Sequence, residues 1–363
     1  MMTRGMAIIG ACLRNRNTLL VGALRARSCQ VIGVFAGVAG LLGACSGFSD
    51  TLLAQGRGRG APPPGPARAA TADIRVLKVR PNVYMLSGAG GNITVLTFAE
   101  GVLLVDTGSA QLADKVLDAV KQLSGKPIAH IINTSASADH VGGNETLAAA
   151  GRRIPQEVVA GEGPMVVAHE KVLTRMSAPT GKQAAAPERA WPNETYHLDT
   201  MKLSTHFHGG EAIELLHQPA AHSDGDSLVW FRHADVIMTG DIFMTTTYPI
   251  IDVANGGTID GVIDGLNRVL EIAFPDFHSE GGTMIIPGHG RLCDMADVGY
   301  YRDMVTIIRG RVQDLVKKGQ TLDQVKAAKP TRDYDARFGA TTGPWTTDMF
   351  VDAVYKTLGA KKK

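Results

Sequence analysis

The sequence predicts an α/β protein in which sheets are layered with helices. From Asp73 onward, short apolar runs rich in β-branched residues alternate with segments whose apolar residues recur at helical spacing. Several of the short runs end in a histidine or an aspartate, and α/β proteins tend to place their chemistry at the carboxyl ends of strands. The alternation and the polar strand ends together indicate a layered α/β fold.

Four successive strands open the globular region, and a helix follows them. Glu100 and Gly101 supply the turn between the last two strands, which are therefore expected to form a hairpin. Beyond Asp106, apolar residues at helical spacing predict an amphipathic helix. The expected strands are 74–79, 83–87, 92–98 and 102–106, and the expected helix is 109–124.

The next loop is the most informative part of the chain. The apolar run 127–133 predicts a buried strand, and a helix is expected over 144–150. Between them, Gly142 and Gly143 allow a tight turn. Asp139 and His140 are therefore expected on a loop at the carboxyl end of a strand.

The alternation continues through the rest of the chain, with one loop-like segment at 177–192. The remaining expected strands are 157–160, 211–216, 227–231 and 235–239, of which the last two pair with each other. The remaining expected helices are 164–175, 258–273, 294–317, 321–327 and 346–358.

Three more residues of metal-binding type follow strand-like runs. His222 lies in a polar turn after an apolar run, and Asp241 and His289 each come at the end of another run. Together with Asp139 and His140, they form a series of imidazoles and carboxylates at strand ends. This mixture of donors is used by zinc hydrolases that keep an open coordination position.

In the residues of these strand ends and in the order in which they follow one another, the chain resembles the metallo-β-lactamase-fold hydrolase superfamily. The resemblance implies an αβ/βα four-layer sandwich of two mixed β-sheets, which we place at residues 73–297, followed by a C-terminal helical extension at 298–363. The matching pieces span about residues 75–295 and are the segments 105–108 and 133–144, His222 in 221–226, and the segments 239–241 and 287–290.

The chain departs from the family's metal motif at two positions. Ser135 and Ser137 stand where the family has two histidines. The resemblance implies that those histidines, with the residue matching His222, hold a first zinc ion. A serine hydroxyl is a poor substitute, because a metal prefers a deprotonated or strongly basic donor. The first site is therefore expected to lack a closed tetrahedral shell.

The donors of the second site are all present. The resemblance assigns a second zinc ion to Asp139, His140 and His289, with Asp241 usually bridging the two ions. His222 is left as a donor of the incomplete first site. We therefore expect one zinc ion rather than two.

Other residues are expected to surround the metal. Asp106 is interpreted as a group that orients the metal loop, with a helix cap as the alternative. Ser135 and Ser137 would line the emptied first site, and Asn144 is grouped with them as a neighbour of the site.

Three residues outside the motifs have competing interpretations. Trp191 and Tyr196 could line the pocket, because this region often covers the active site in the family, or they could belong to the core. Cys293 lies four residues beyond His289, and we interpret it as a packing residue rather than a metal ligand.

The expected reaction is hydrolysis of a carbonyl ester or amide of the lactone, β-lactam or thioester type. A water on the metal, made more acidic by the cation, would attack the carbonyl carbon. Asp139 would bind the ion or act as a base, and His222 would hydrogen-bond the water or the developing oxyanion. Two alternatives stay open. One is a non-catalytic binding protein on the same fold, and the other is an enzyme with a serine nucleophile at Ser135 or Ser137 and His222 as its base.

The first 72 residues are expected to lie outside the folded domain. Five arginines precede an apolar run, and no acidic residue appears before Asp50, which predicts a signal peptide over 1–44. Cys45 fits the lipidated first residue of a bacterial lipoprotein, the alternative being cleavage near Ala54. The Gly-, Pro- and Arg-rich segment 45–72 is expected to be a disordered linker.

These features predict an exported protein, either periplasmic or attached to a membrane only through a lipid on Cys45. A net charge of +2 and an aromatic content of 6% give no sign of a nucleic-acid surface. The expected partner is a small-molecule substrate.

Overall fold

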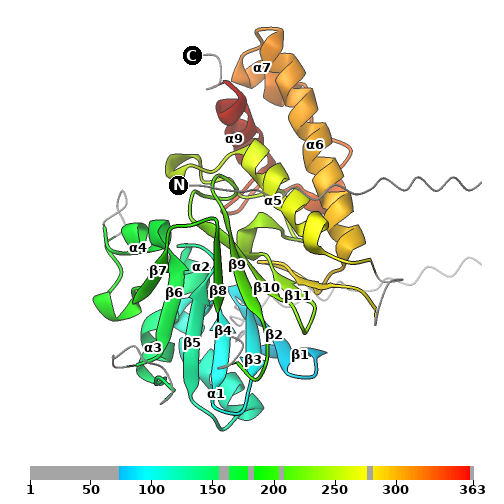
Figure 1. Ribbon diagram of the computed structural model, residues 1–363. Helices are drawn as coiled ribbons and strands as arrows, with labels where there is room; N and C mark the ends of the chain where they lie inside the picture. Colours follow the sequence, from blue (N-terminus) through cyan, green and yellow to red (C-terminus); the bar gives the residue numbers. More distant parts are fainter. Residues whose placement is uncertain (1–72, 155–162, 179–183, 204–207, 276–280, 360–363) are drawn as a thin grey trace, which may run out of the picture. The chain divides into compact units, whose positions relative to one another are not determined.

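Two β-sheets pack face to face, and helices cover the outer side of each sheet (Figure 1). The computed structural model describes residues 73–154, 163–178, 184–203, 208–275 and 281–359. The layers are helix, sheet, sheet and helix, and both sheets are mixed. The αβ/βα sandwich expected from the sequence is confirmed.

The first sheet has seven strands that lie side by side in chain order. The first four run antiparallel as successive hairpins, and the last four run parallel. The strands are β1 (Arg75–Arg80), β2 (Val83–Ala89), β3 (Gly91–Thr97), β4 (Val102–Val105), β5 (Ile128–Asn133), β6 (Met165–His169) and β7 (Glu194–Tyr196). The predicted hairpin is that of β3 and β4.

The second sheet has five strands in the order β12, β11, β10, β9, β8. Its neighbours are antiparallel except for β11 and β12, which run parallel. The strands are β8 (Thr200–Leu203), β9 (Ile213–Gln218), β10 (Asp226–Phe231), β11 (Val236–Met238) and β12 (Met284–Ile286).

Apolar side chains alternate along the strands between two cores. In β4, Leu103 and Val105 pack in the core between the two sheets, whereas Val102 and Leu104 pack in the core that includes α1 (Ala113–Leu123). Successive side chains of a strand point to opposite faces, so a strand covered on both sides must be apolar throughout. This explains the unbroken apolar run that predicts β4.

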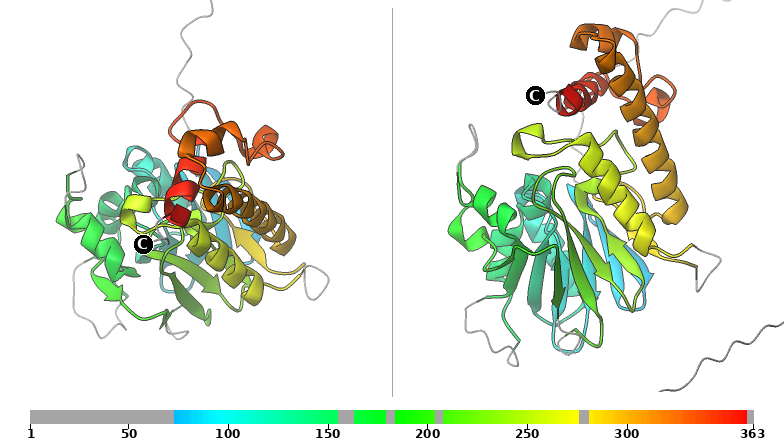
Figure 2. Two further views of the ribbon diagram at one scale, coloured as in Figure 1. Left: turned by 90° about the horizontal axis from the view of Figure 1, so that it is seen from above. Right: turned by 45° about the horizontal axis from the view of Figure 1, so that its top comes forward.

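Helices form the two outer layers (Figure 2). One layer, over the first sheet, includes α1 and α3 (Asn144–Ala149), and the other, over the second sheet, begins with α5 (Ile259–Ile272) and α6 (Met295–Lys317). The other helices are α2 (Ala138–Val141), α4 (Glu170–Met176), α7 (Leu322–Ala327), α8 (Asp335–Phe338) and α9 (Thr347–Gly359). Short 3₁₀ turns lie at Ala110–Leu112, Glu188–Ala190, Gly240–Ile242 and Val253–Asn255.

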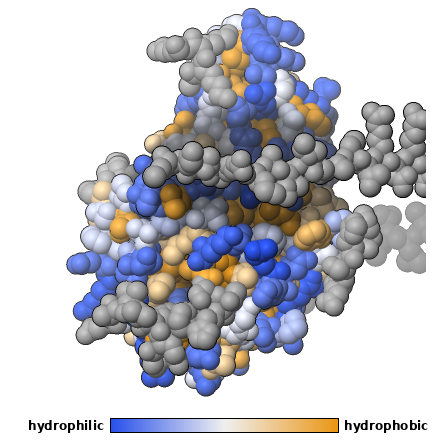
Figure 3. Space-filling view, in the orientation of Figure 1, coloured by the Kyte–Doolittle hydropathy of each residue, from blue (hydrophilic) through white to orange (hydrophobic). Residues whose placement is uncertain are grey.

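The C-terminal helices share a hydrophobic core with the second sheet. Tyr248, from the segment that follows β11, stacks on Phe350 of α9 at 4.8 Å between ring centroids. Its hydroxyl donates a hydrogen bond to Asp335 at 2.8 Å and to the backbone oxygen of Thr331 at 3.2 Å. Hydrophilic residues predominate over α6 and α7 on the face in Figure 3. Helix α6 begins at Met295, so the expected boundary after residue 297 falls inside a helix.

Within the described part of the chain, no helix has both the length and the apolar character needed to cross a membrane.

The prediction of a helix over 164–175 is wrong in its first half. Met165–His169 forms β6, a strand that runs parallel to β5, and only then does α4 begin. The buried pair Val166 and Val167 fits a strand covered on both faces, and this tertiary environment outweighs the local helical pattern. The strand expected at 157–160 lies outside the described residues, and β7, β8 and α8 were not predicted.

Candidate metal centre

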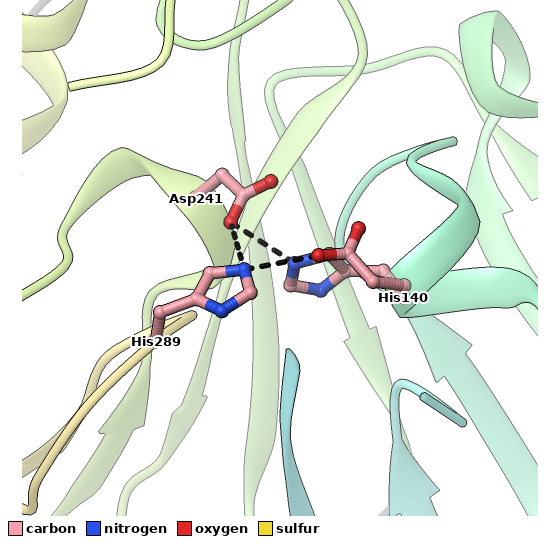
Figure 4. A group of neighbouring side chains, drawn as sticks. His140, Asp241 and His289 are labelled. Atoms are coloured by element: carbon pink, nitrogen blue, oxygen red, sulfur yellow. Dashed lines mark hydrogen bonds and ion pairs between the residues drawn. The ribbon is translucent and has the colours of Figure 1, made fainter. Parts of the chain in front are cut away.

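Four side chains from separate parts of the chain meet where strands of both sheets end. Asp139 and His140 follow β5 of the first sheet, Asp241 follows β11, and His289 follows β12 of the second. One ligand-type atom from each side chain lies within 4.8 Å of those of the other three. Figure 4 shows the side chains of Asp241 and His289 pointing toward that of His140.

The distances among these atoms suit a small cation. Asp241 Oδ1 lies 3.0 Å from His140 Nε2 and 3.4 Å from His289 Nε2. His289 Nε2 also lies 3.1 Å from Asp139 Oδ2. A tetrahedral zinc ion with bonds of roughly 2.0–2.2 Å holds its donors roughly 3.3–3.6 Å apart. These three distances lie close to that range, and the other pairs of donor atoms lie within 4.8 Å of each other.

The centre is buried on one side and open on the other. The side chains of His140 and Asp241 are buried, whereas those of Asp139 and His289 are 40% and 23% exposed. A ligand can therefore reach the donors from the side of Asp139 and His289. A catalytic zinc site has three protein ligands and keeps the fourth position for water, so a water position at this centre requires that the exposed Asp139 leaves the ion or that the shell expands to five ligands.

Asp139 and His140 lie in a short helix, not in the loop expected from the sequence. The four-residue helix α2 contains both residues, and Ser137 precedes it as the N-cap. The backbone oxygen of His140 accepts hydrogen bonds from Thr107 N at 2.8 Å and from Thr107 Oγ1 at 3.0 Å. These bonds fasten α2 to the segment that follows β4.

Asp106 contacts the ring nitrogen of His140 that points away from the centre. Its Oδ2 lies 2.6 Å from His140 Nδ1, so the Nε2 atom of the ring faces Asp241. Asp106 also accepts hydrogen bonds from Thr134 N at 2.8 Å and from Thr134 Oγ1 at 2.7 Å. A carboxylate on the far nitrogen fixes the tautomer and the direction of a ligating histidine. Asp106 therefore contacts His140 as an orienting group and caps no helix.

Asn144 lies outside the group of four donors and hydrogen-bonds to the segments around it. Its Nδ2 donates to Asn133 Oδ1 at 2.8 Å and to the backbone oxygen of Ala190 at 2.9 Å. Its Oδ1 accepts from Thr107 Oγ1 at 2.9 Å and from Asn133 Nδ2 at 3.1 Å. Asn144 thus ties β5 to two neighbouring segments and is not one of the four donors. No role was predicted from the sequence for Thr107, Asn133 or Thr134.

The two glycines after α2 are required by space rather than by turn geometry. Gly142 and Gly143 have φ angles of −59° and −82°, which any residue can adopt. A Cβ atom on Gly142 would lie 2.4 Å from the backbone oxygen of Ala138 and 2.5 Å from Ala110 N. On Gly143, it would lie 2.4 Å from the backbone oxygen of Thr107. The expected turn is present at both glycines, and the close backbone contacts, rather than the φ angles of the turn, demand glycine there.

His222 lies beside the group of four rather than within it. Its Nε2 is 3.9 Å from Asp241 Oδ2, and its Nδ1 is 3.3 Å from Asp226 Oδ1. Buried Asp226 also accepts hydrogen bonds from Ser223 N at 2.6 Å and Ser223 Oγ at 2.9 Å. Asp226 therefore supports His222 much as Asp106 supports His140.

Ser135 and Ser137 stand at the positions of the first site. Ser135 is buried, and its Oγ accepts a hydrogen bond from Ser137 N at 3.3 Å. Among the described residues, no hydrogen bond joins either hydroxyl to His222, the contact that a serine nucleophile would need.

Trp191, Tyr196 and Cys293 do not belong to the centre. Trp191 Nε1 donates to the backbone oxygen of Ala186 at 2.9 Å, and the Tyr196 hydroxyl lies 2.6 Å from Ser227 Oγ. Both rings pack against hydrophobic clusters. Burial raises the pKa of the Cys293 thiol to about 12, and the thiol is not among the four donors.

Carboxylates around the imidazoles control their charge. Burial opposes protonation of His289 and His222, but hydrogen bonds to Asp139 and Asp226 and the charge of Asp241 outweigh it and raise the pKa of each ring to about 9. Burial likewise disfavours the ionised form of Asp241, yet the neighbouring imidazoles hold its pKa well below the usual range. Without a metal, protons on the imidazoles balance the carboxylates.

The melting temperature of the metal-free protein is therefore expected to fall as the pH rises from about 6.5 to about 9. The folded-state pKa values of His222 and His289 are about 9 and the unfolded value is about 6.5, so their stabilisation is complete below pH 6.5 and is lost through this window. Ligation requires neutral imidazoles, so the stabilisation by added zinc should grow over the same window. Thermal melts with chelator and with zinc measure both trends. A metal-free melting temperature that rises from pH 6.5 to 9 would contradict the assignment.

A two-sheet sandwich with imidazoles and carboxylates gathered at its strand ends defines a class of metal-binding hydrolase folds. The model of the metallo-beta-lactamase superfamily matches residues 86–324, which is more than half of the chain and includes all four donors. The chain belongs to the metallo-beta-lactamase superfamily.

Two solved sulfatase structures are similar in fold, and a metallo-beta-lactamase structure was also matched. The stereoselective inverting sec-alkylsulfatase Pisa1 from Pseudomonas sp. is similar at a TM-score of 0.54 and 17% identity, over 78% of this chain and 50% of that one. A double mutant of the sec-alkyl sulfatase PisA1 gives a TM-score of 0.55 at 17% identity, with coverages of 78% and 50%. A metallo-beta-lactamase from Pontibacter korlensis gives a TM-score of 0.49 at 15% identity, over 64% of this chain and 99% of that one.

The chain spans about half the length of the sulfatases that it matches. At such identities, the likeness shows the fold alone. No match was found among curated proteins.

Proposed function

We propose that this protein is a hydrolase that depends on one zinc ion, held by Asp139, His140, Asp241 and His289. The observation that carries the proposal is the convergence of these four donors, with one open side, in front of the Asp106–His140 contact. Nitrogen and oxygen donors in a tetrahedral set favour zinc among the common divalent ions.

One ion is favoured over two because the first site lacks donors. Among the residues that the structure describes, His222 and the second oxygen of Asp241 are the donors at that position, and they lie 3.9 Å apart. Ser135 and Ser137 offer neutral hydroxyls, which bind zinc weakly. A tetrahedral ion needs more than these two donors to be held there.

The cation, when bound, supplies Lewis acidity, which polarises a carbonyl group and makes water a stronger nucleophile. Two side chains of the protein would perform the other steps of the reaction. Asp139, the most exposed of the four, is placed to accept a proton from the attacking water. His222, held at Nδ1 by Asp226, directs Nε2 toward the centre and can donate a hydrogen bond to the developing oxyanion.

The substrate in this proposal is a small molecule with a carbonyl ester or amide, such as a lactone, a β-lactam or a thioester. The N-terminal sequence supports export, with residues 1–44 as the signal peptide and residues 45–72 as a linker. The proposal places the protein in a bacterial periplasm or on a membrane through a lipid on Cys45, and includes no nucleic-acid partner.

Metal content and turnover of the purified protein test this function together. Elemental analysis should find about one zinc ion per chain, and a panel of nitrocefin, lactones, thioesters and a sec-alkyl sulfate should include a substrate whose turnover a chelator abolishes. The sulfate is included because of the likeness to sec-alkylsulfatases. Two tightly bound ions would contradict the one-ion site. The absence of both metal and turnover after zinc addition would favour a non-catalytic binding protein.

A further inference from the structure

A cavity of about 400 Å³ lies next to the metal centre. Helices α2 and α4, the start of α3 and the segment that ends at Ala190 form its walls. None of the four donors lines it, but Ser137 and His222 do. The cavity and the centre therefore meet at two of the residues that mark the incomplete first metal site.

Small apolar side chains form one part of the walls of this cavity, and polar side chains such as Ser137, Ser223 and Asn255 form the rest. Val141 and Met176 contribute the larger apolar groups, and the small ones are Ala110, Ala136, Ala138, Ala178, Ala184, Ala186 and Ala190. Ligand pockets usually exceed about 300 Å³, and an apolar cavity of about 150 Å³ already holds benzene. A cavity of about 400 Å³ can therefore hold a phenyl ring or a short alkyl chain.

The charged groups at the cavity do not favour an anionic guest. Arg175 forms an ion pair with Asp224 and donates a hydrogen bond to the backbone oxygen of Asn255 at 2.8 Å, so its charge already has a partner. The other chargeable residues in the described lining are Glu145 and Asp252, both acidic, and His222, whose imidazole is paired with Asp226. A carboxylate placed here would meet these negative charges and no unpaired cation of the described lining.

The two serines at the positions of the family's metal-binding histidines also make an anionic guest less favourable. A zinc ion at the first site would place a double positive charge where the cavity meets the centre. With serines at 135 and 137, this junction consists of a small hydroxyl and the His222 ring. The change widens the approach and removes the charge that would attract an anion.

We infer that this cavity binds the uncharged acyl side group of the substrate, which makes the enzyme an esterase or lactonase for short aliphatic or phenyl-substituted acyl groups. The inference rests on the proposed function, because it assumes that the scissile carbonyl lies at the four donors. The position of the first metal becomes part of the substrate pocket. The chain distinguishes its substrates by fit in an alanine-lined cavity.

The test compares three p-nitrophenyl esters, the acetate, the hexanoate and the hemiglutarate, on the zinc-loaded protein. Hexanoate should have the highest kcat/KM, and the hemiglutarate, which ends in a carboxylate, should be about tenfold or more slower than hexanoate. Ala186→Leu should lower kcat/KM for hexanoate about tenfold and leave acetate within about twofold, because the added side chain fills the cavity. Ala178→Leu serves as a second variant if Ala186→Leu does not fold.

Ala212→Leu, at a partly buried alanine outside the cavity, is the matched control and should leave the ratio of hexanoate to acetate unchanged. An equal loss on both esters in Ala186→Leu, or faster turnover of the hemiglutarate than of hexanoate, would overturn the inference. Hexanamide binding, followed by calorimetry, separates the two claims. If no ester is hydrolysed but Ala186→Leu weakens hexanamide binding, the proposed function fails and the cavity assignment stands. If esters are hydrolysed but hexanamide binds neither protein, the cavity assignment fails alone.

Discussion

Asp241→Asn should remove zinc from the purified protein and lower hydrolysis on the order of a thousandfold. Asp241 lies within 3.4 Å of two imidazoles and is the buried carboxylate among the four donors. An asparagine has nearly the same shape but no charge, so the change removes a donor and the counter-charge of His140 and His289. Elemental analysis and turnover on the best substrate of the panel measure the two effects.

Asp264→Asn is the matched control, since it makes the same chemical change on the exposed side of α5. This variant should keep both its zinc and its turnover. If Asp241→Asn also retained about one zinc ion per chain with full activity, Asp241 would not be a ligand, and the centre would have to be assigned to other residues.

Asp106→Asn should weaken zinc binding about tenfold to a hundredfold, although Asp106 is not one of the four donors. The amide replaces the carboxylate that lies 2.6 Å from His140 Nδ1, so the ring loses the group that fixes its tautomer and direction. Asparagine tolerates the positive φ of 64° at this position, so the backbone should not be strained. Competition with a chelator of known affinity measures the zinc dissociation constant, and circular dichroism verifies the fold.

Asp226→Asn provides the comparison, because Asp226 is in the corresponding place behind His222. It should lower turnover without lowering zinc content, since His222 stands outside the group of four. Equal loss of zinc in the two variants would mean that His222 is a ligand. No change in zinc affinity in Asp106→Asn would remove Asp106 from the support of the centre.

The layered α/β class could be predicted from the alternation of apolar runs and helical patterns, and the two-sheet sandwich followed from the resemblance to the metallo-β-lactamase-fold superfamily. The run 127–133 predicted the buried strand β5, and the hairpin of β3 and β4 followed from Glu100 and Gly101. The region of β6 misled because a five-residue strand and a seven-residue helix join without a break, and a single helical pattern can be fitted across both. Strand pairing with β5 decides between them, and pairing is not visible in a local window.

The donors could be predicted because each follows a strand, so only their meeting point needed the structure. What the sequence does not reveal is which neutral partners hold them. Thr134 and Asn133 are ordinary polar residues in the chain, and they gain a role only because β4 and β5 end side by side. Alanines of the cavity come from separate segments, and no spacing rule connects Ala138 with Ala190.

The contact of Tyr248 with the C-terminal helices has a consequence for cooperativity. Tyr248 lies seven residues after Asp241 and is held by Asp335 and by the ring of Phe350. Unfolding of α9 would therefore free the segment that contains the metal donor Asp241. Displacement of Asp241 from the centre would in turn weaken the packing of Tyr248 against α9. We therefore expect the C-terminal helices and the centre to unfold together, so that a cation bound at the strand ends should also slow exchange of the amide hydrogens of α9.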